Sequence, residues 1–150
     1  MKKTKHLLPY YIVSLFFLAL YPSCENKRDD SGTLGGMWQL VEWKATDGSI
    51  AYNKPDTTLY YKVRNNILML QELPGESDTY FLTYYRQSEG NIIINPDKIF
   101  NNAELDKIAH PVDDLKKYGI PNSGCLHIDV LESDKMVLSS EEGTLRFRKY

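Results

Sequence analysis

Apolar and polar residues alternate in short runs over most of the chain after residue 36, and turn-forming residues separate the runs. An alternation with a period of two is typical of β-strands that bury one face. The predicted strands cover residues 37–44, 58–64, 67–73, 79–87, 91–95, 126–130, 136–140 and 145–148. Eight antiparallel strands can close into a barrel, which removes the exposed edges of a flat sheet. We therefore expect an all-β fold, an eight-stranded antiparallel barrel.

The hairpin around Asn65-Asn66 supports these strands because its register and its hydrophobic pattern agree. Asparagines tolerate the positive φ angles of a two-residue type I′ turn. Such a turn pairs Tyr61 with Leu70 and places apolar side chains of both strands on one face. The face predicted to point inward consists of Leu59, Tyr61, Val63, Leu68 and Leu70, with Glu72 at its end.

The other hairpins give weaker register predictions. The predicted pairs are Leu138 with Phe147 across a turn at residues 142–143, and Val130 with Met136 and Ile128 with Leu138 across a loop at residues 132–134. This alternation turns Arg146 and Arg148 away from the core. The hairpin at residues 89–90 is apolar on both faces, so its register stays open. In an unbroken first strand, Trp38 and Trp43 lie on opposite faces.

Residues 96–124 interrupt the strand pattern and have helical character. Residues 103–109 form a predicted short helix, and Pro111 opens a second one that Gly119 closes. We expect a short helical insertion between the fifth and sixth strands that covers one end of the barrel.

The first 23 residues have the layout of a secretory signal peptide. Three lysines precede an apolar run over residues 7–21, which is short for a permanent membrane span of about 20 residues. Small residues follow the run. Cleavage before Cys24 leaves 127 of the 150 residues, enough for one domain with one core.

Cys24 resembles the lipidated cysteine of bacterial lipoproteins. The window Tyr21-Pro22-Ser23-Cys24 is similar to their lipobox, although Tyr21 replaces the usual leucine. The alternative is a plain signal peptide followed by a cysteine without a role. On the lipoprotein interpretation, residues 24–32 are a lipid-anchored flexible tether and residues 33–150 are the folded domain.

The polar stretch at residues 25–30 resembles the acidic export signal of lipoproteins from the Bacteroidota. That resemblance implies a lipid-anchored protein of the outer membrane, exposed at the cell surface. Whether the periplasmic or the outer face holds it stays open at this point.

Charge and cysteine content narrow the function classes. Cleavage of the signal segment removes three lysines, so the net charge of the mature chain is −5. No cluster of basic residues suggests that the protein binds nucleic acid. With Cys24 assigned to lipid, Cys125 stands alone and no intramolecular disulfide forms. A lone cysteine in a strand is more often a small buried apolar residue than a nucleophile.

The chain lacks the sequence motifs of common catalytic and metal sites. It has no Gly-rich phosphate loop, no Gly-x-Ser-x-Gly elbow, no paired cysteines and no His-Glu-x-x-His. His127 and Asp129 share a strand face, but it is the face opposite to the hydrophobic one, so a solvated exterior pair is the expected arrangement. His110 lies beside Asp113-Asp114 at a predicted helix start. We expect no enzyme, no metal and no cofactor.

The first strand contains Gly36-Met37-Trp38, and this Gly-x-Trp resembles the first strand of the lipocalins. The resemblance covers residues 33–150 and is similar in particular to lipocalin-like lipoproteins of Bacteroidota, including residues 115–120 and 138–150. It implies that an arginine from the last strand, Arg146 or Arg148, packs across Trp38 at the closed end of the barrel. Two departures are a missing Thr-Asp-Tyr motif and helices in mid-chain.

Two functions follow. The lipocalin resemblance implies a carrier or sensor that binds a small apolar or amphipathic ligand in the barrel, with Glu42 and Glu72 at its mouth. The alternative is a non-catalytic surface module with a filled barrel, whose outer face binds a protein or a glycan. Eight tyrosines in the mature domain suit either function.

Overall fold

The computed structural model describes residues 31–52, 58–73, 80–101 and 112–150. The strands are β1 (Gly36–Lys44), β2 (Ile50–Tyr52), β3 (Thr58–Arg64), β4 (Ile67–Leu73), β5 (Tyr80–Ser88), β6 (Asn91–Asn101), β7 (Cys125–Leu131), β8 (Lys135–Ser140) and β9 (Gly143–Lys149). The 3-10 helices are η1 (Gly32–Leu34) and η3 (Val112–Tyr118). None of the helices in these ranges is long and apolar enough to cross a membrane.

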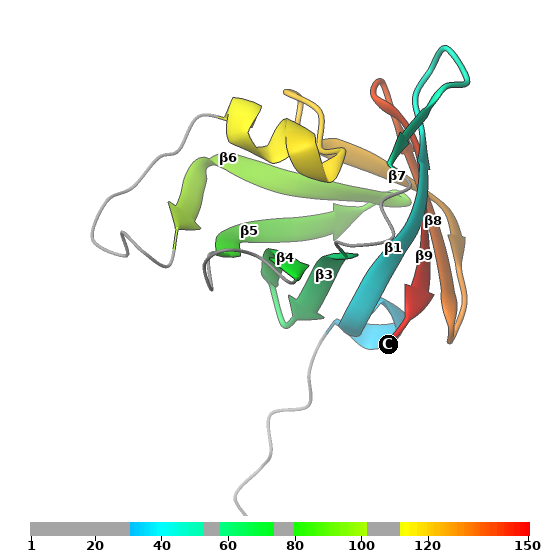
Figure 1. Ribbon diagram of the computed structural model, residues 1–150. Helices are drawn as coiled ribbons and strands as arrows, with labels where there is room; N and C mark the ends of the chain where they lie inside the picture. Colours follow the sequence, from blue (N-terminus) through cyan, green and yellow to red (C-terminus); the bar gives the residue numbers. More distant parts are fainter. Residues whose placement is uncertain (1–30, 53–57, 74–79, 102–111) are drawn as a thin grey trace, which may run out of the picture.

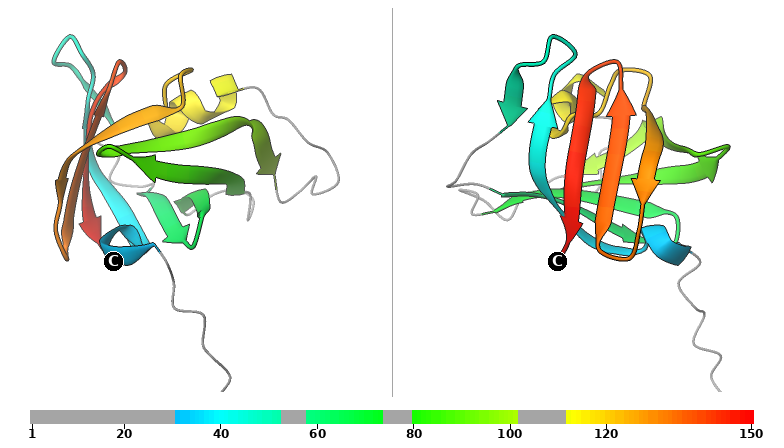
Figure 2. Two further views of the ribbon diagram at one scale, coloured as in Figure 1. Left: turned by 180° about the vertical axis from the view of Figure 1, so that it is seen from behind. Right: turned by 90° about the vertical axis from the view of Figure 1, so that its right-hand side faces the viewer.

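The strands form one closed antiparallel sheet (Figure 1, Figure 2). Neighbours follow the chain order from β3 to β9, and β1 pairs with both β3 and β9. Short β2 pairs with β1 alone, so eight of the nine strands make the ring. The predicted all-β fold and eight-stranded antiparallel barrel are confirmed. Figure 1 shows η1 at the lower end of the barrel and η3 over its upper part.

The β3–β4 hairpin has the predicted register. Tyr61 pairs with Leu70 and Val63 with Leu68, so the face predicted to point inward does so. The turn type differs from the expectation. Of its two central residues only Asn65 has a positive φ, 54°, whereas a type I′ turn needs two.

The β8–β9 hairpin pairs Leu138 with Leu145 and not with Phe147. The turn lies at residues 141–142, one residue earlier than predicted. Gly143 therefore starts β9, where a Cβ would lie 2.0 Å from the carbonyl oxygen of Lys44. Because the glycine has no Cβ, β9 can approach β1 closely at this position. The change shifts the register by two residues, which leaves every side chain on its predicted face.

Bulges change the facing of residues in β1 and β7. In β7, Ile128 pairs with Leu138 as predicted, but an irregularity before Val130 pairs it with Val137 in place of Met136. In β1, a bulge between Leu40 and Glu42 reverses the alternation. Trp43 consequently packs against the same core as the buried Trp38, and not on the opposite face.

The predicted helical insertion is corrected by the structure. β6 continues through Pro96 to Asn101, because β6 bulges between the pairs Tyr85–Ile94 and Thr83–Ile99, and a bulge accepts a proline that cannot donate to the ladder. Between β6 and β7 the described chain has the 3-10 helix η3 and no α-helix. Residues 103–109, predicted as a helix, lie outside the described residues. Gly119 ends η3 with φ 78°, as predicted for a helix end.

Trp38 anchors the closed end of the barrel. Its side chain is fully buried, and its indole Nε1 donates a hydrogen bond of 2.7 Å to the carbonyl oxygen of Leu34 in η1. Trp43 is only partly buried and its Nε1 donates to the carbonyl oxygen of Glu142 at 3.1 Å. Both indole N–H groups donate a hydrogen bond, but the Trp38 side chain is the more deeply buried of the two, so its removal costs more packing contacts.

Trp38→Ala should lower the free energy of unfolding by about 3–5 kcal/mol, the usual cost of deleting a large buried aromatic side chain. Trp43→Ala should cost clearly less, because part of its surface is already exposed to solvent. Urea unfolding curves of both variants measure the difference. Equal losses would contradict the assignment of Trp38 as the anchor.

Candidate functional site

The inner face of β3 and β4 supplies the candidate lumen. Leu59, Tyr61, Val63, Leu68 and Leu70 are at most 4% exposed and belong to one core cluster. Rings from across the barrel meet them: the Tyr61 and Phe147 centroids are 4.7 Å apart. The structure therefore brings all five predicted lumen residues together.

The two glutamates predicted at the mouth separate. Glu72 pairs with buried Leu59 and raises the pKa of Tyr118 by its charge, so it lies at the inner side of the barrel. Glu42 lies on the outer surface, where one carboxylate oxygen is 3.1 Å from Nε of Arg146. The β1 bulge is the reason, because it turns Glu42 out as it turns Trp43 in. Glu42 is thus removed from the candidate site.

A lysine, and not an arginine, packs across Trp38. Lys149 Nζ lies 4.7 Å from the centre of the Trp38 ring. Arg146 pairs with Glu42, and Arg148 donates to Gln39 at 2.6 Å on the outer face. Alternation in β9 already turns both arginines outward and Lys149 inward. The sequence pattern therefore contained the signal for the lysine.

Gly36 makes room for this lysine. A Cβ at Gly36 would lie 2.7 Å from Cε of Lys149, and the φ of Gly36 is 125°, which disfavours any other residue. The Lys149 side chain therefore packs between Gly36 and Trp38, the two defined residues of the Gly-x-Trp motif.

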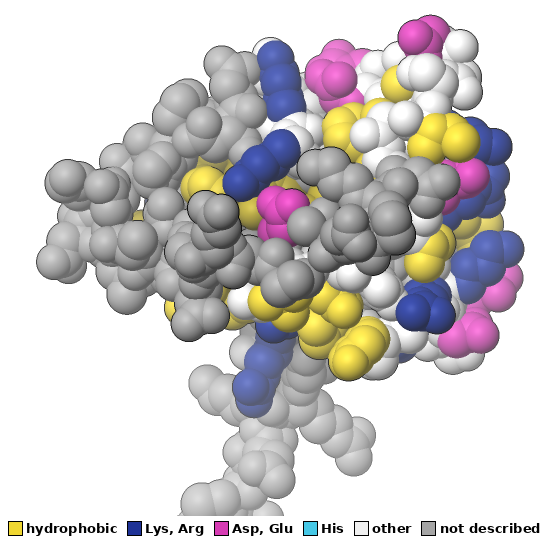
Figure 3. Space-filling view, in the orientation of Figure 1, with side chains coloured by type: hydrophobic (Ala, Val, Ile, Leu, Met, Phe, Trp, Pro, Cys, Tyr) yellow, Lys and Arg dark blue, Asp and Glu magenta, His cyan; other side chains and the backbone are white. Residues whose placement is uncertain are grey.

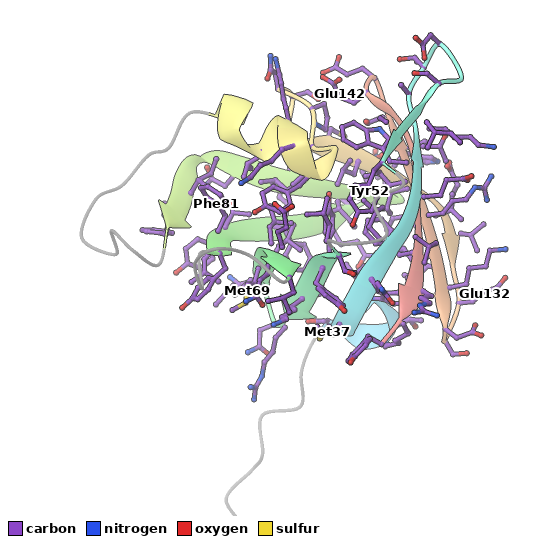
Figure 4. The ribbon with its side chains drawn as sticks, in the orientation of Figure 1. Met37, Tyr52, Met69, Phe81, Glu132 and Glu142 are labelled. Carbon is purple, nitrogen blue, oxygen red and sulfur yellow. The ribbon has the colours of Figure 1, made fainter. Side chains whose placement is uncertain are left out.

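The segment that covers the upper barrel contributes side chains to its interior. Leu115, Tyr118 and Ile120 are at most 1% exposed and belong to the same core cluster as the lumen residues. The Tyr61 hydroxyl donates a 2.7 Å hydrogen bond to the carbonyl oxygen of Tyr118, and the Phe81 ring lies 5.9 Å from the Tyr118 ring. Sequence reasoning placed a cap here but missed that its side chains enter the barrel (Figure 4).

Burial controls the titration of the two inner tyrosines. It raises the pKa of Tyr118 to about 12, with a smaller contribution from the negative charge of Glu72. It also raises the pKa of Tyr61 well above its usual value, with the Tyr118 phenol adding to the shift. Both hydroxyls therefore stay neutral at physiological pH and act as hydrogen-bonding groups.

The core side chains of the lower lumen enclose one very small cavity. The cavity that remains in the lower lumen, lined among others by Leu34, Tyr61 and Met136, has a volume of about 10 Å³. That is about the least space that can hold one water molecule. This cavity is too small for a ligand.

The exterior polar residues form no compact site. His127 Nδ1 lies 3.0 Å from Oδ1 of Asn91, and its Nε2 lies 4.0 Å from Asp129, with all three side chains near solvent. The part of the chain that the structure describes has no group of three metal-binding side chains. Cys125 is a half-buried free thiol. Cys24 and His110 lie outside the described residues.

Comparison with known proteins agrees with this architecture. The model of the lipocalin-like domain matches residues 16–150. A crystal structure of a lipocalin-like protein from Bacteroides uniformis is 20% identical, with a TM-score of 0.56, and the match covers 79% of this chain and 100% of that one. A crystal structure of an uncharacterized protein from Bacteroides eggerthii is 21% identical, with a TM-score of 0.54, and the match covers 77% of this chain and 98% of that one. These identities establish a shared fold alone. None of the curated proteins matches the chain.

The inner tyrosines predict an alkaline loss of stability. A tyrosine with a folded pKa near 12 contributes stability that is fully present below the unfolded pKa of about 10 and is lost as the pH rises through 12. The free energy of unfolding, from urea titrations at stepped pH, should therefore fall over this window. Tyr118→Phe should fall less steeply, and the exposed Tyr84→Phe should follow the wild type. A Tyr118→Phe curve parallel to the wild type would contradict the assignment.

Proposed function

Because the chain belongs to the lipocalin-like domain family, we propose that it is a lipid-anchored protein of the cell envelope that binds one small apolar or amphipathic ligand inside its barrel. The observation that carries this proposal is the origin of the side chains in the upper lumen. Leu115, Tyr118 and Ile120 come from η3 and the residues after it, and they pack against the strand residues of the same core cluster.

A ligand can therefore take the place of the segment around η3, here called the plug (residues 112–120). The plug contributes Leu115, Tyr118 and Ile120 to the interior without being part of the sheet. When the plug moves out, the strands keep their hydrogen bonds and the lining of the lumen stays in place. Displacement of this kind resembles the opening of lids in other proteins.

The lining that the plug covers suits a ligand with an apolar body and one polar group. Leu59, Leu70, Phe81 and Phe147 are apolar and buried. The Tyr61 hydroxyl, which now donates to the plug backbone, becomes free to donate to the ligand. Ligand pockets are typically apolar with a few polar groups that orient the ligand. Because Glu72 is acidic, a cationic or neutral hydrogen-bond donor at the mouth is favoured over an anion.

The N-terminal segment supports the anchor. The three lysines, the short apolar run and Cys24 occur in the order that lipoprotein processing requires, and the family match begins at residue 16, before the cysteine. We place the mature protein on the outer membrane, held by the lipid on Cys24. No catalytic role, metal or cofactor is part of the proposal.

Ligand entry that requires plug displacement has a testable consequence. The apparent affinity equals the intrinsic affinity multiplied by the fraction of open molecules, so loosening the plug should strengthen binding. Gly119→Ala should loosen it, because a Cβ at this position lies 2.6 Å from Cδ2 of Leu145 and the φ of 78° is unfavourable for alanine. A strain of about 1 kcal/mol should lower the apparent Kd about fivefold for aromatic or uncharged amphipathic fluorescent probes.

Gly48→Ala is the matched control. Gly48 has a similar φ of 83° in the loop between β1 and β2, with no atom within 4 Å of a new Cβ, so its strain is the same kind at a distant site. It should leave probe affinity unchanged. If Gly119→Ala binds probes no better than Gly48→Ala, ligands do not enter through the plug. If no probe shows saturable binding to any variant, the filled-barrel surface module becomes the better account.

The lipid anchor is tested separately in a Gram-negative host. Cys24→Ala should abolish incorporation of labelled fatty acid and release the protein from the membrane fraction. Cys125→Ala, which leaves the other cysteine in place, should incorporate label like the wild type. Undiminished labelling of Cys24→Ala would end the lipoprotein hypothesis.

A further inference from the structure

An apolar groove of about 520 Å³ lies on the outer face of the barrel. Its floor is a row of paired residues that crosses four strands: Met37 of β1 pairs with Lys62, Lys62 with Met69, and Met69 with Leu82 of β5. Because paired residues share a face, these side chains point outward together. Figure 4 shows the labelled Met37 and Met69 on the underside of the molecule.

A second row extends the apolar surface. Ile67 of β4 pairs with Tyr84 of β5, and these side chains are 39% and 40% exposed. The Phe100 ring packs edge-on against Tyr84 at 6.4 Å. Contiguous apolar surface of this kind on a soluble domain marks a site of interaction. Figure 3 shows hydrophobic side chains gathered on this underside.

The charges on the outer face of the three described strands β3, β4 and β5 have one sign. Lys62, Arg64 and Arg86 are the charged residues on the outer face of β3, β4 and β5, since β3 and β5 contain no acidic residue and Glu72 of β4 points inward. The outer face of β1 and β9 differs, because Glu42 pairs there with Arg146. Figure 3 likewise shows basic and acidic side chains mixed on the right-hand side of the molecule.

The described chain begins at the edge of this groove. The Ser31 hydroxyl donates a 2.9 Å hydrogen bond to the carbonyl oxygen of Asn65, and Asn65 lines the groove together with Gly36. Cys24 precedes Ser31 by seven residues. Seven extended residues span at most about 25 Å, so a lipid on Cys24 holds this rim within that distance of the bilayer.

We propose that the outer face of β3, β4 and β5 docks onto the surface of the anionic membrane that carries the lipid anchor. The apolar rows enter the boundary between headgroups and acyl chains, and Lys62, Arg64 and Arg86 lie against lipid phosphates. The inference rests on the proposed lipid anchor and is independent of ligand binding in the lumen. Docking leaves the plug, which lies over the upper part of the barrel in Figure 1, directed away from the bilayer.

The charge pattern favours a membrane over a second copy of the chain. A two-fold dimer through this face would bring the same basic residues of both copies together, with no acidic partner on the described part of the face. An anionic bilayer supplies the opposite charge over a wide, adaptable surface.

Depth measurements on the lipidated mature protein test the docking directly. Single nitroxide labels are placed through Met69→Cys or, as control, Val41→Cys, each with Cys125→Ser, in vesicles of phosphatidylcholine and phosphatidylglycerol. Val41 is 45% exposed on β1 beside the bulge, away from the groove. The Met69 label should gain access to oxygen and be protected from a water-soluble nickel complex, and the Val41 label should stay open to that complex.

Charge removal provides the second arm. In the mature chain with Cys24→Ser, Arg64→Gln or Arg86→Gln should each reduce the partition coefficient into the same vesicles about fivefold. Arg148→Gln, which removes an exposed arginine of β9, should not change it. High salt should weaken binding of the unsubstituted chain.

Four outcomes would overturn the proposal. The first two are equal accessibility of both labels and equal effects of the three arginine variants. The third is protection of the Met69 label in the absence of vesicles that increases with protein concentration, which would indicate a second copy of the chain. The fourth is binding to neutral vesicles only. Probe binding in the lumen is measured on the same variants and should be unchanged. Loss of probe binding with intact docking would count against the proposed function alone.

Discussion

Strand β1 pairs with β3 along its first four residues and with β9 from Trp38 to Lys44, and this double pairing closes the sheet. An open sheet of the same strands would leave the inner side chains of β1 and β9 against solvent and two edges unpaired. Closure requires β1 to bend, and the bulge after Leu40 supplies the bend. It also requires the strands to approach closely, which Gly36 and Gly143 permit where a Cβ would meet Lys149 or Lys44.

The interior that results is wider than the strand side chains alone can fill. At the top, the Tyr61 hydroxyl donates a hydrogen bond to the backbone of the plug. The lower end is sealed by Trp38 and Leu34, whose hydrogen bond ties η1 to the barrel. The barrel is therefore closed below by β1 and η1, and above by a segment that is not part of the sheet.

The outer surface is divided in a comparable way. The face of β1 and β9 carries the paired charges of Glu42 and Arg146. The face of β3, β4 and β5 carries apolar rows flanked by basic residues, at the side where Ser31 begins the described part of the chain. The apolar outer groove and the plug therefore occupy different parts of one small domain.

The sequence by itself determined the eight strands of the ring, without the short β2, and the register of β3 with β4, because a two-residue turn links neighbouring runs and fixes which of their apolar residues share the inner face. It also predicted five lumen residues, since side-chain facing depends on parity alone. Glu42 and Trp43 were placed on the wrong faces because the bulge in β1 is imposed by pairing with β9, about a hundred residues further along the chain. Tyr118 entered the lumen through a contact with Tyr61 that spans 57 residues, and Pro96 stayed in a strand because β6 bulges there in its pairing with β5. These features arise from contacts between distant segments, and no local pattern of apolar and polar residues encodes them.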